Sequence, residues 1–131
     1  PLILQNVHRY FLYLALMFLV FLAFDVGKAM WFEDPATGRM SFGLGVGTLL
    51  LAVNVLLLGS YTLSCHSLRH LVGGRLNRLS QSPTRATAYR CVSCLNRHHP
   101  KWAWFSLVFV GFTDVYVRLC SMGVITDLRL F

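Results

Sequence analysis

Apolar residues dominate the first third of the chain. No charged residue occurs from Tyr10 to Phe24, and the apolar pattern continues as far as Phe32. A helix over about residues 10–32 rises about 1.5 Å per residue, which is enough to cross a hydrocarbon core of about 30 Å. The pattern therefore predicts a first transmembrane helix at 10–32.

Two further apolar segments follow. The stretch from Met40 to Leu68 contains no Asp, Glu, Lys or Arg, and it predicts a second helix over about 42–68. A third segment predicts a helix over about 102–122. We therefore expect an all-α integral membrane protein with three transmembrane helices, forming a single anchor domain over residues 1–131.

The composition agrees with a membrane protein. Of the 131 residues, 56% are hydrophobic and 13% are charged, and the mean hydropathy is +0.58. Soluble domains carry about 25% charged residues, so a soluble single-domain enzyme is excluded. The high apolar fraction also excludes a disordered chain, and four Cys residues are too few for a disulfide-stapled module.

The net charge of +7 comes largely from one stretch, residues 69–101, which contains no Asp or Glu. A basic stretch between apolar spans is typical of the cytoplasmic side, so we expect a cytoplasmic loop there and the C-terminus outside. The sequence has no known basic and aromatic recognition module, so we expect no nucleic-acid partner. The seven basic residues of the stretch are Arg69, Arg75, Arg78, Arg85, Arg90, Arg97 and Lys101.

Candidate metal ligands lie on both sides of this basic stretch. His66 and His70 are spaced i,i+4 and share one helix face, and a C-x-x-C pair precedes the third helix. We expect one redox centre with ligands from Cys65, His66, His70, Cys91, Cys94 and His99. A [2Fe–2S] cluster with mixed Cys and His ligands, as in Rieske centres, is favoured, although the spacing differs from the Rieske pattern. Haem b is the alternative, and zinc remains open because C-x-x-C with His also suits zinc.

Polar and aromatic residues near these ligands suggest a quinone site. Hydroxyl groups of the second helix could donate to a quinone carbonyl, an arginine could hold a quinone oxygen or a haem propionate, and two tryptophans could line a cleft or form an interfacial belt. These candidates are Ser60, Tyr61, Ser64, Arg69, Trp102 and Trp104.

The third helix carries a second polar group. Asp114 and Arg118 are spaced i,i+4 with the acid first, which favours an ion pair, and Tyr116 lies between them. Charged residues inside a membrane are costly, so they indicate a functional polar face shared with other helices or an interhelical clasp.

Three stretches resemble the membrane-anchor subunit of actinobacterial succinate dehydrogenases. They are GSYTLSCHSLRHLVGG (59–74), LNRHHPKWAWFSL (95–107) and GFTDVYVRLCSMGVITD (111–127). The first is also similar to the H-x-x-x-G-x-R-H-L helix of respiratory succinate dehydrogenase anchors, in which His binds haem b. His66, Arg69 and His70 match that motif, Leu68 stands where Gly is expected, and Asn96 and His99 match the segment opening the last helix.

The resemblance implies a multi-pass subunit of the bacterial plasma membrane. Such an anchor docks an iron–sulfur subunit, to which a flavoprotein subunit is attached, and passes electrons from succinate oxidation to menaquinone or ubiquinone. Family anchors hold haem or an iron–sulfur centre. Because such anchors often have five helices and this chain begins with Pro1, we expect a processed chain or a fragment that lacks two helices.

Two other functions remain open from the sequence. A structural or zinc-stabilised membrane scaffold without a redox role would use the same Cys and His residues. A transporter is disfavoured because charged residues are few and no internal repeat occurs. The sequence leaves open whether the chain takes part in quinone reduction itself.

Overall fold

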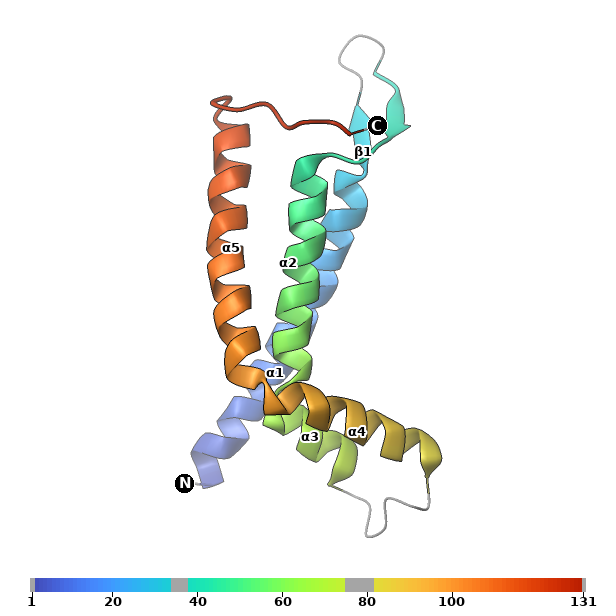
Figure 1. The fold of residues 1–131 in the computed structure, drawn as a ribbon, viewed down its shortest axis with the longest axis vertical. Coiled ribbons are helices and arrows are strands. Elements are labelled where there is room, and N and C mark those ends of the chain that lie inside the picture. The colour runs from blue at the N-terminus through green and yellow to red at the C-terminus, as the bar shows by residue number, and fades with distance from the viewer. Residues whose placement is uncertain (1, 34–37, 75–81, 131) are drawn as a thin grey trace.

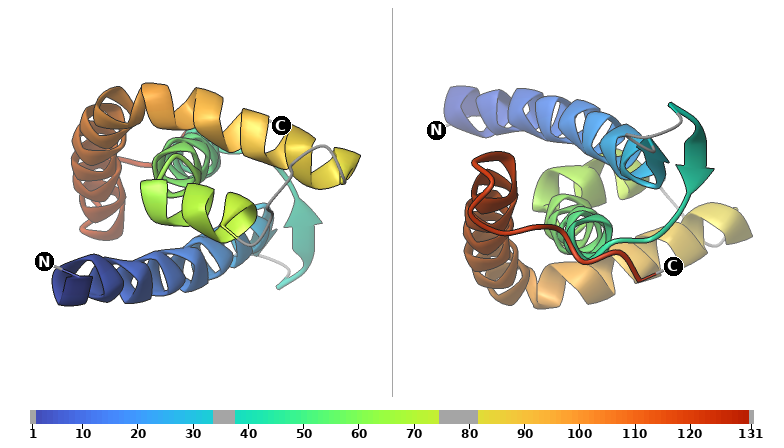
Figure 2. Two further views of the ribbon diagram at one scale, coloured as in Figure 1. Left: turned by 90° about the horizontal axis from the view of Figure 1, so that it is seen from below. Right: turned by 90° about the horizontal axis from the view of Figure 1, so that it is seen from above.

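The computed structural model describes residues 2–33, 38–74 and 82–130. Three long helices stand side by side, with α2 between α1 and α5, and two shorter helices cross below them (Figures 1 and 2). In chain order the elements are α1 (Leu2–Ala29), β1 (Trp31–Glu33), β2 (Met40–Phe42), α2 (Val46–Leu63), α3 (His66–Gly73), α4 (Pro83–Arg97) and α5 (His99–Ser121).

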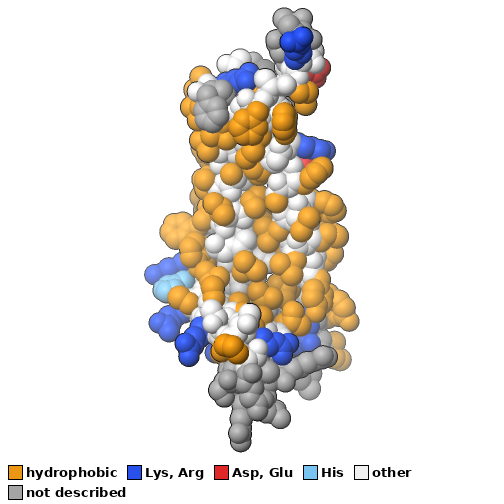
Figure 3. All heavy atoms as spheres, turned by 90° about the vertical axis from the view of Figure 1, so that its right-hand side faces the viewer, with side chains coloured by type: hydrophobic (Ala, Val, Ile, Leu, Met, Phe, Trp, Pro, Cys, Tyr) orange, Lys and Arg blue, Asp and Glu red, His pale blue; other side chains and the backbone are white. Residues whose placement is uncertain are grey.

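The three long helices are the membrane spans. The segments Val7–Ala29, Val46–Leu63 and His99–Ser121 are each long and apolar enough to cross a bilayer. This confirms the predicted all-α fold with three transmembrane helices. Apolar side chains cover the middle of the face seen in Figure 3, and basic side chains gather near its lower end, where α3 and α4 lie.

Small polar residues fill the contacts between these helices. Among the residues that the structure describes, seven of the buried residues are polar and three are hydrophobic. Lipid tails are as apolar as leucine, so membrane helices associate through close packing of small residues and not through burial of apolar surface. The buried polar residues are Thr48, Asn54, Thr62, Ser64, Ser67, Ser106 and Thr113.

The first helix ends earlier than predicted. Trp31 and Phe32 were expected in the helix but lie in β1, which pairs antiparallel with β2. Trp31 faces Phe42 across the ladder, and their rings meet edge to face with centroids 5.9 Å apart. Aromatic cross-strand pairs of this kind stabilise a short hairpin, which the hydrophobic pattern alone did not distinguish from helix.

The second helix also ends earlier than predicted, at Leu63 instead of residue 68. The backbone of Cys65 is extended, with φ −63° and ψ 136°, and the chain restarts as α3 in a new direction. No Gly or Pro marks this break. The side-chain amide of Asn96 donates to the Ser64 carbonyl at 2.7 Å, so a contact with α4 satisfies a backbone acceptor that the interrupted helix leaves free.

The predicted basic loop 69–101 is largely helical where it is described. It contains most of α3 and all of α4, while residues 75–81 lie outside the described residues. Pro83 and Pro100 each occupy the first turn of a helix, where the missing N–H costs no hydrogen bond. The helices α3 and α4 pack closely, because a Cβ on Gly73 would lie only 2.7 Å from the Tyr89 ring.

The opposite end of the bundle is closed by the C-terminal segment. Asp127 accepts hydrogen bonds from the Gly47 backbone N–H and from the Tyr116 hydroxyl, each at 2.9 Å. Its carboxylate therefore caps the start of α2 and lies where a side chain on Gly45 would clash. The N-terminal part of α1 lies at one end of the bundle, together with α3 and α4. The hairpin and the C-terminal segment lie at the other end (Figure 1). We call these the α3–α4 end and the hairpin end.

Candidate metal centre and adjoining cleft

Three metal-ligating side chains converge at the α3–α4 end. His8 of α1, Cys65 at the helix break and His66 at the start of α3 place their ligand atoms within 4.8 Å of one another. His8 Nε2 lies 3.1 Å from Cys65 Sγ, and the His8 and His66 rings stack with centroids 4.8 Å apart. Thiolate and imidazole together suit zinc, copper and iron centres.

The break between α2 and α3 creates this cluster. In one continuous helix, Cys65 and His66 would be adjacent positions pointing about 100° apart. The extended backbone at Cys65 changes the relative directions of the two side chains, so that both approach His8 of α1. His8 was missed by sequence reasoning because it lies 57 residues from Cys65, and a lone His before an apolar helix carries no spacing motif. The only signal in the sequence was that His8 is expected on the same side of the membrane as Cys65 and His66.

The surroundings of His66 favour its neutral form. Partial burial lowers its pKa below the ordinary 6.5, and the nearby imidazoles of His8 and His70 lower it further. Only neutral imidazole can ligate a metal, so this shift reduces the competition between protons and a metal ion at neutral pH.

His99 lies beside the cluster with a defined orientation. The hydroxyl of the fully buried Ser64 donates to the Tyr61 carbonyl at 2.7 Å, and Ser64 Oγ is also 2.7 Å from His99 Nδ1. With the hydroxyl proton directed to the Tyr61 carbonyl, the Ser64 oxygen can accept from a His99 Nδ1–H. The neutral ring then carries its lone pair on Nε2, which is the state of a histidine ready to bind a metal.

A cleft of about 170 Å³ adjoins the cluster between α1, α2 and α5. The Tyr61 ring, which stacks on His99 at 4.9 Å, forms part of its wall. Thr62 also lines the cleft, and its hydroxyl is buried without a hydrogen-bond partner. Sequence reasoning missed Thr62 because Ser and Thr side chains in helices usually bond to their own backbone. The full lining is His8, Phe11, Leu12, Ala15, Tyr61, Thr62, Cys65 and His99.

Other predicted quinone contacts lie elsewhere. The Ser60 hydroxyl donates to the carbonyl of Leu56, and Arg69 donates to the Tyr89 hydroxyl at 3.2 Å. Trp102 is half-buried and Trp104 is 69% exposed. Among the described residues, none of these four predicted contacts lines the cleft.

The remaining predicted ligands are spread around the cluster. The His70 ring is 6.3 Å from the His66 ring and nearly perpendicular to it. Cys91 and Cys94 are exposed on α4. Among the described residues, the converging group contains neither these cysteines nor His70 or His99, so their roles as ligands stay predictions.

The polar group of the third helix lies at the hairpin end. Arg118 Nε is 2.8 Å from Asp114 Oδ2, which confirms the predicted ion pair, and the two side chains are 72% and 57% exposed. Tyr116 turns instead to Asp127 and lines a separate cavity of about 300 Å³. Most of the length of α5 separates these residues from the His and Cys cluster (Figure 1).

These features define a multi-pass membrane anchor with a candidate metal centre at one end. The chain matches the family of the actinobacterial succinate dehydrogenase subunit SdhC over residues 1–123, and it belongs to that family. Its family and its three spans make it a multi-pass protein of the plasma membrane.

A solved structure has the same fold. One chain of the Mycobacterium smegmatis Sdh1 complex in the apo form is 44% identical to this chain, with a TM-score of 0.86. The similarity covers 100% of this chain and 47% of that chain, so this chain spans about half the length of its relative. Comparison with the curated proteins gives no significant match.

Proposed function

We propose that this chain carries electrons from succinate oxidation to a membrane quinone, as part of the membrane anchor of a succinate dehydrogenase, through a metal centre held by His8, Cys65 and His66. Membership of the SdhC family supports the first part. The observation that carries the second is the convergence of three ligand atoms within 4.8 Å, next to a cleft inside a membrane bundle.

The ligand geometry favours a small metal centre over haem between these residues. The two axial imidazoles of a haem lie on opposite faces of the porphyrin. The His8 and His66 rings instead stack side by side, only 5° from parallel, with centroids 4.8 Å apart. His66 and His70 come from successive turns of one helix and also share a side. Neither pair can therefore enclose a porphyrin from both faces in this arrangement.

A [2Fe–2S] centre needs four protein ligands, and the site offers a mixed set. His8, Cys65 and His66 would supply three, and His99 would supply the fourth from the wall of the same cleft. The set holds one thiolate instead of the two of a Rieske centre, because Cys91 and Cys94 are exposed on α4 and lie outside the converging group. Such a cluster transfers one electron at a time. Imidazole ligands raise its potential relative to an all-cysteine cluster.

The cleft supplies the contacts that a quinone ring requires. Its walls are apolar and aromatic, and the Thr62 hydroxyl is a buried donor without a partner. Thr62 would donate to one quinone carbonyl, and the Tyr61 and Phe11 rings would pack against the ring faces. Both menaquinone and ubiquinone present a flat ring with two carbonyl groups, so either can bind in this way.

The α3–α4 end is proposed to face the cytoplasm and to dock the iron–sulfur subunit, which carries the flavoprotein subunit. The basic stretch 69–101 contains no acidic residue, and its described part stands at this end of the structure together with Arg9. An acidic face on the partner would complement the exposed Arg90, Arg97 and Lys101. Further membrane helices would cover the exposed Asp114–Arg118 pair on α5.

Variants of the ligands test this function. Cys65→Ser and His66→Gln should each remove the iron and abolish electron transfer from succinate to quinone, because a cluster rarely survives loss of a ligand. Cys120→Ser is the matched control, since Cys120 is half-buried at the other end of α5.

Iron content, visible absorption and electron paramagnetic resonance of the purified complex read out the result. Full iron and normal turnover in Cys65→Ser would refute the proposed centre. A Soret band would identify haem. A colourless protein containing zinc would support a structural scaffold instead.

A further inference from the structure

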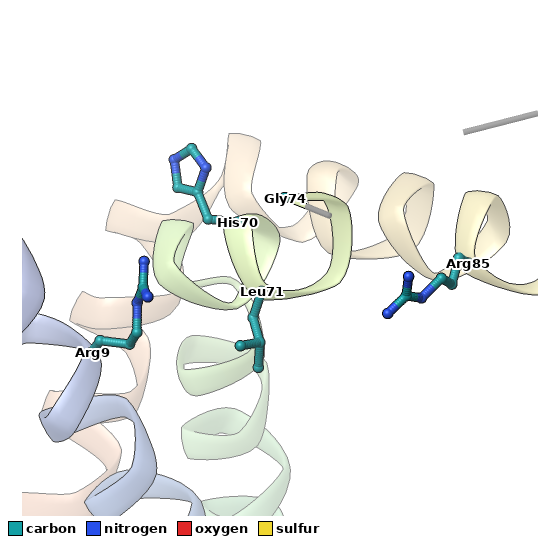
Figure 4. A pocket seen from close by; sticks show the side chains of 5 residues that line it. All are labelled: Arg9, His70, Leu71, Gly74 and Arg85. Carbon is teal, nitrogen blue, oxygen red and sulfur yellow. The ribbon is translucent and has the colours of Figure 1, made fainter. Parts of the chain in front are cut away.

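A second, larger cavity opens at the α3–α4 end. It has a volume of about 650 Å³ and is lined by Arg9, His70, Leu71, Gly74 and Arg85. Figure 4 shows Arg9 on α1 and Arg85 on α4 on opposite sides of α3, which carries His70 and Leu71 between them. Three separate helices therefore contribute to one basic cavity.

Among the described residues, no acidic side chain pairs with the positive charge of this cavity. Arg9 and Arg85 are exposed, and among the described residues the structure gives neither of them an ion pair. The chain contains no Asp or Glu before Asp25 and none between Asp34 and Asp114. The described residues therefore offer this cavity no neutralising anion.

The cavity also lies at the level of the membrane surface. Arg9 is the third residue of the span Val7–Ala29, so its backbone enters the bilayer region. Leu71 is half exposed and points from α3 toward the transmembrane side, whereas His70 points the opposite way (Figure 4). The cavity thus combines two guanidinium groups with an apolar wall on the side of the lipid.

We propose that this cavity binds the phosphodiester headgroup of an anionic phospholipid. Arg9 and Arg85 bind phosphate oxygens, since planar guanidinium groups match phosphate with paired hydrogen bonds. The first methylenes of an acyl chain pass Leu71. Basic pockets between membrane helices at the cytoplasmic side commonly hold such headgroups.

A phospholipid fits better than an acidic segment of a partner protein. Leu71 gives an acyl chain an apolar surface that a carboxylate-bearing peptide would not use, and a lipid reaches this depth by lateral diffusion. The inference does not depend on the metal centre, because Arg9 and Arg85 are not among the proposed ligands.

The preference of the complex for one lipid over another tests the proposal. The complex containing this chain is placed in phosphatidylcholine nanodiscs with phosphatidylglycerol that carries a nitroxide on an acyl chain. Electron paramagnetic resonance then gives the fraction of motionally restricted lipid. We expect the wild type to prefer phosphatidylglycerol over labelled phosphatidylcholine by about tenfold, and Arg9→Gln/Arg85→Gln to lose most of this preference.

Matched variants separate a built site from general surface charge. Arg97→Gln/Lys101→Gln removes two exposed basic residues at the same end and should keep a preference close to that of the wild type. Arg9→Lys/Arg85→Lys preserves the charge and should keep a large part of it. The spectroscopic signal of the metal centre in this chain should be equal in all of these variants, so a failed metal centre and a failed lipid site are distinguishable.

Three outcomes would overturn the proposal. Equal loss of preference in the Arg97→Gln/Lys101→Gln control would show only a diffuse surface effect. Displacement of the labelled lipid by inorganic phosphate would identify a free-anion site. Unchanged lipid preference in Arg9→Gln/Arg85→Gln, with loss of co-purifying subunits, would assign the cavity to protein docking.

Discussion

Substituting Ser64 tests the proposed role of His99 most sharply. The Ser64 hydroxyl is fully buried and lies 2.7 Å from both the Tyr61 carbonyl and His99 Nδ1. Ser64→Ala removes the acceptor of the His99 Nδ1–H. That N–H is left without its partner, at a cost of about 1–3 kcal/mol, and Nε2 is no longer fixed as the lone-pair nitrogen.

The expected consequence is weaker metal binding with the fold preserved. Loss of an outer hydrogen bond to a metal-ligating His reduces metal affinity by about 10- to 100-fold. Ser60→Ala is the matched control, because Ser60 lies one turn earlier and its hydroxyl bonds only to the Leu56 carbonyl of its own helix. Ser60→Ala should leave the metal affinity unchanged.

A chelator competition series measures the effect. Iron retained by each variant is determined after equilibration with increasing chelator, and circular dichroism confirms equal helix content. We expect Ser64→Ala to lose iron at lower chelator concentration than Ser60→Ala. Identical retention curves for the two variants would show that His99 is not a ligand and that the Ser64 contact is only structural.

Three further predictions address charge and topology. Asp114→Asn leaves Arg118 unpaired, which costs about 1 kcal/mol or less at an aqueous surface but about 2–3 kcal/mol against lipid, so unfolding in bilayers should show a larger loss than in detergent. A Cys introduced at Ser82 should resist a membrane-impermeant reagent added outside intact cells, and efficient labelling would invert the topology. Acidification from neutral pH should release the metal, because His66 is neutral above its lowered pKa and becomes protonated below it. The same protonation destabilises the folded state as pH falls, since the unfolded histidine binds a proton more readily. Iron retention that is independent of pH down to about pH 5 would exclude His66 as a ligand.

The spans could be predicted from the sequence because membrane insertion depends on local composition. Runs of apolar residues of sufficient length identify helices whatever their neighbours are. The Asp114–Arg118 pair was predictable for a similar reason, since i,i+4 spacing fixes proximity within one helix. Both features depend on residues that are close in sequence.

The candidate site depends on contacts between distant segments, and there the sequence was insufficient. The break after Leu63 has no Gly or Pro signal and is stabilised by Asn96, which lies 32 residues from Ser64. Without that break, neither the convergence of His8 with Cys65 and His66 nor the open hydroxyl of Thr62 could be anticipated. The C-x-x-C motif lies on α4, where Cys91 and Cys94 are exposed, and their role as ligands stays a prediction.

Pulsed electron paramagnetic resonance on protein labelled with ¹⁵N-histidine tests the central claim most directly. In the reduced wild-type complex, the paramagnetic iron centre should show hyperfine coupling to histidine nitrogen. His8→Gln should lose the centre or its coupling, because His8 Nε2 lies beside Cys65 Sγ in the converging group. A wild-type protein without a paramagnetic iron signal, or one whose nitrogen couplings are unchanged in His8→Gln, would contradict the proposed metal centre.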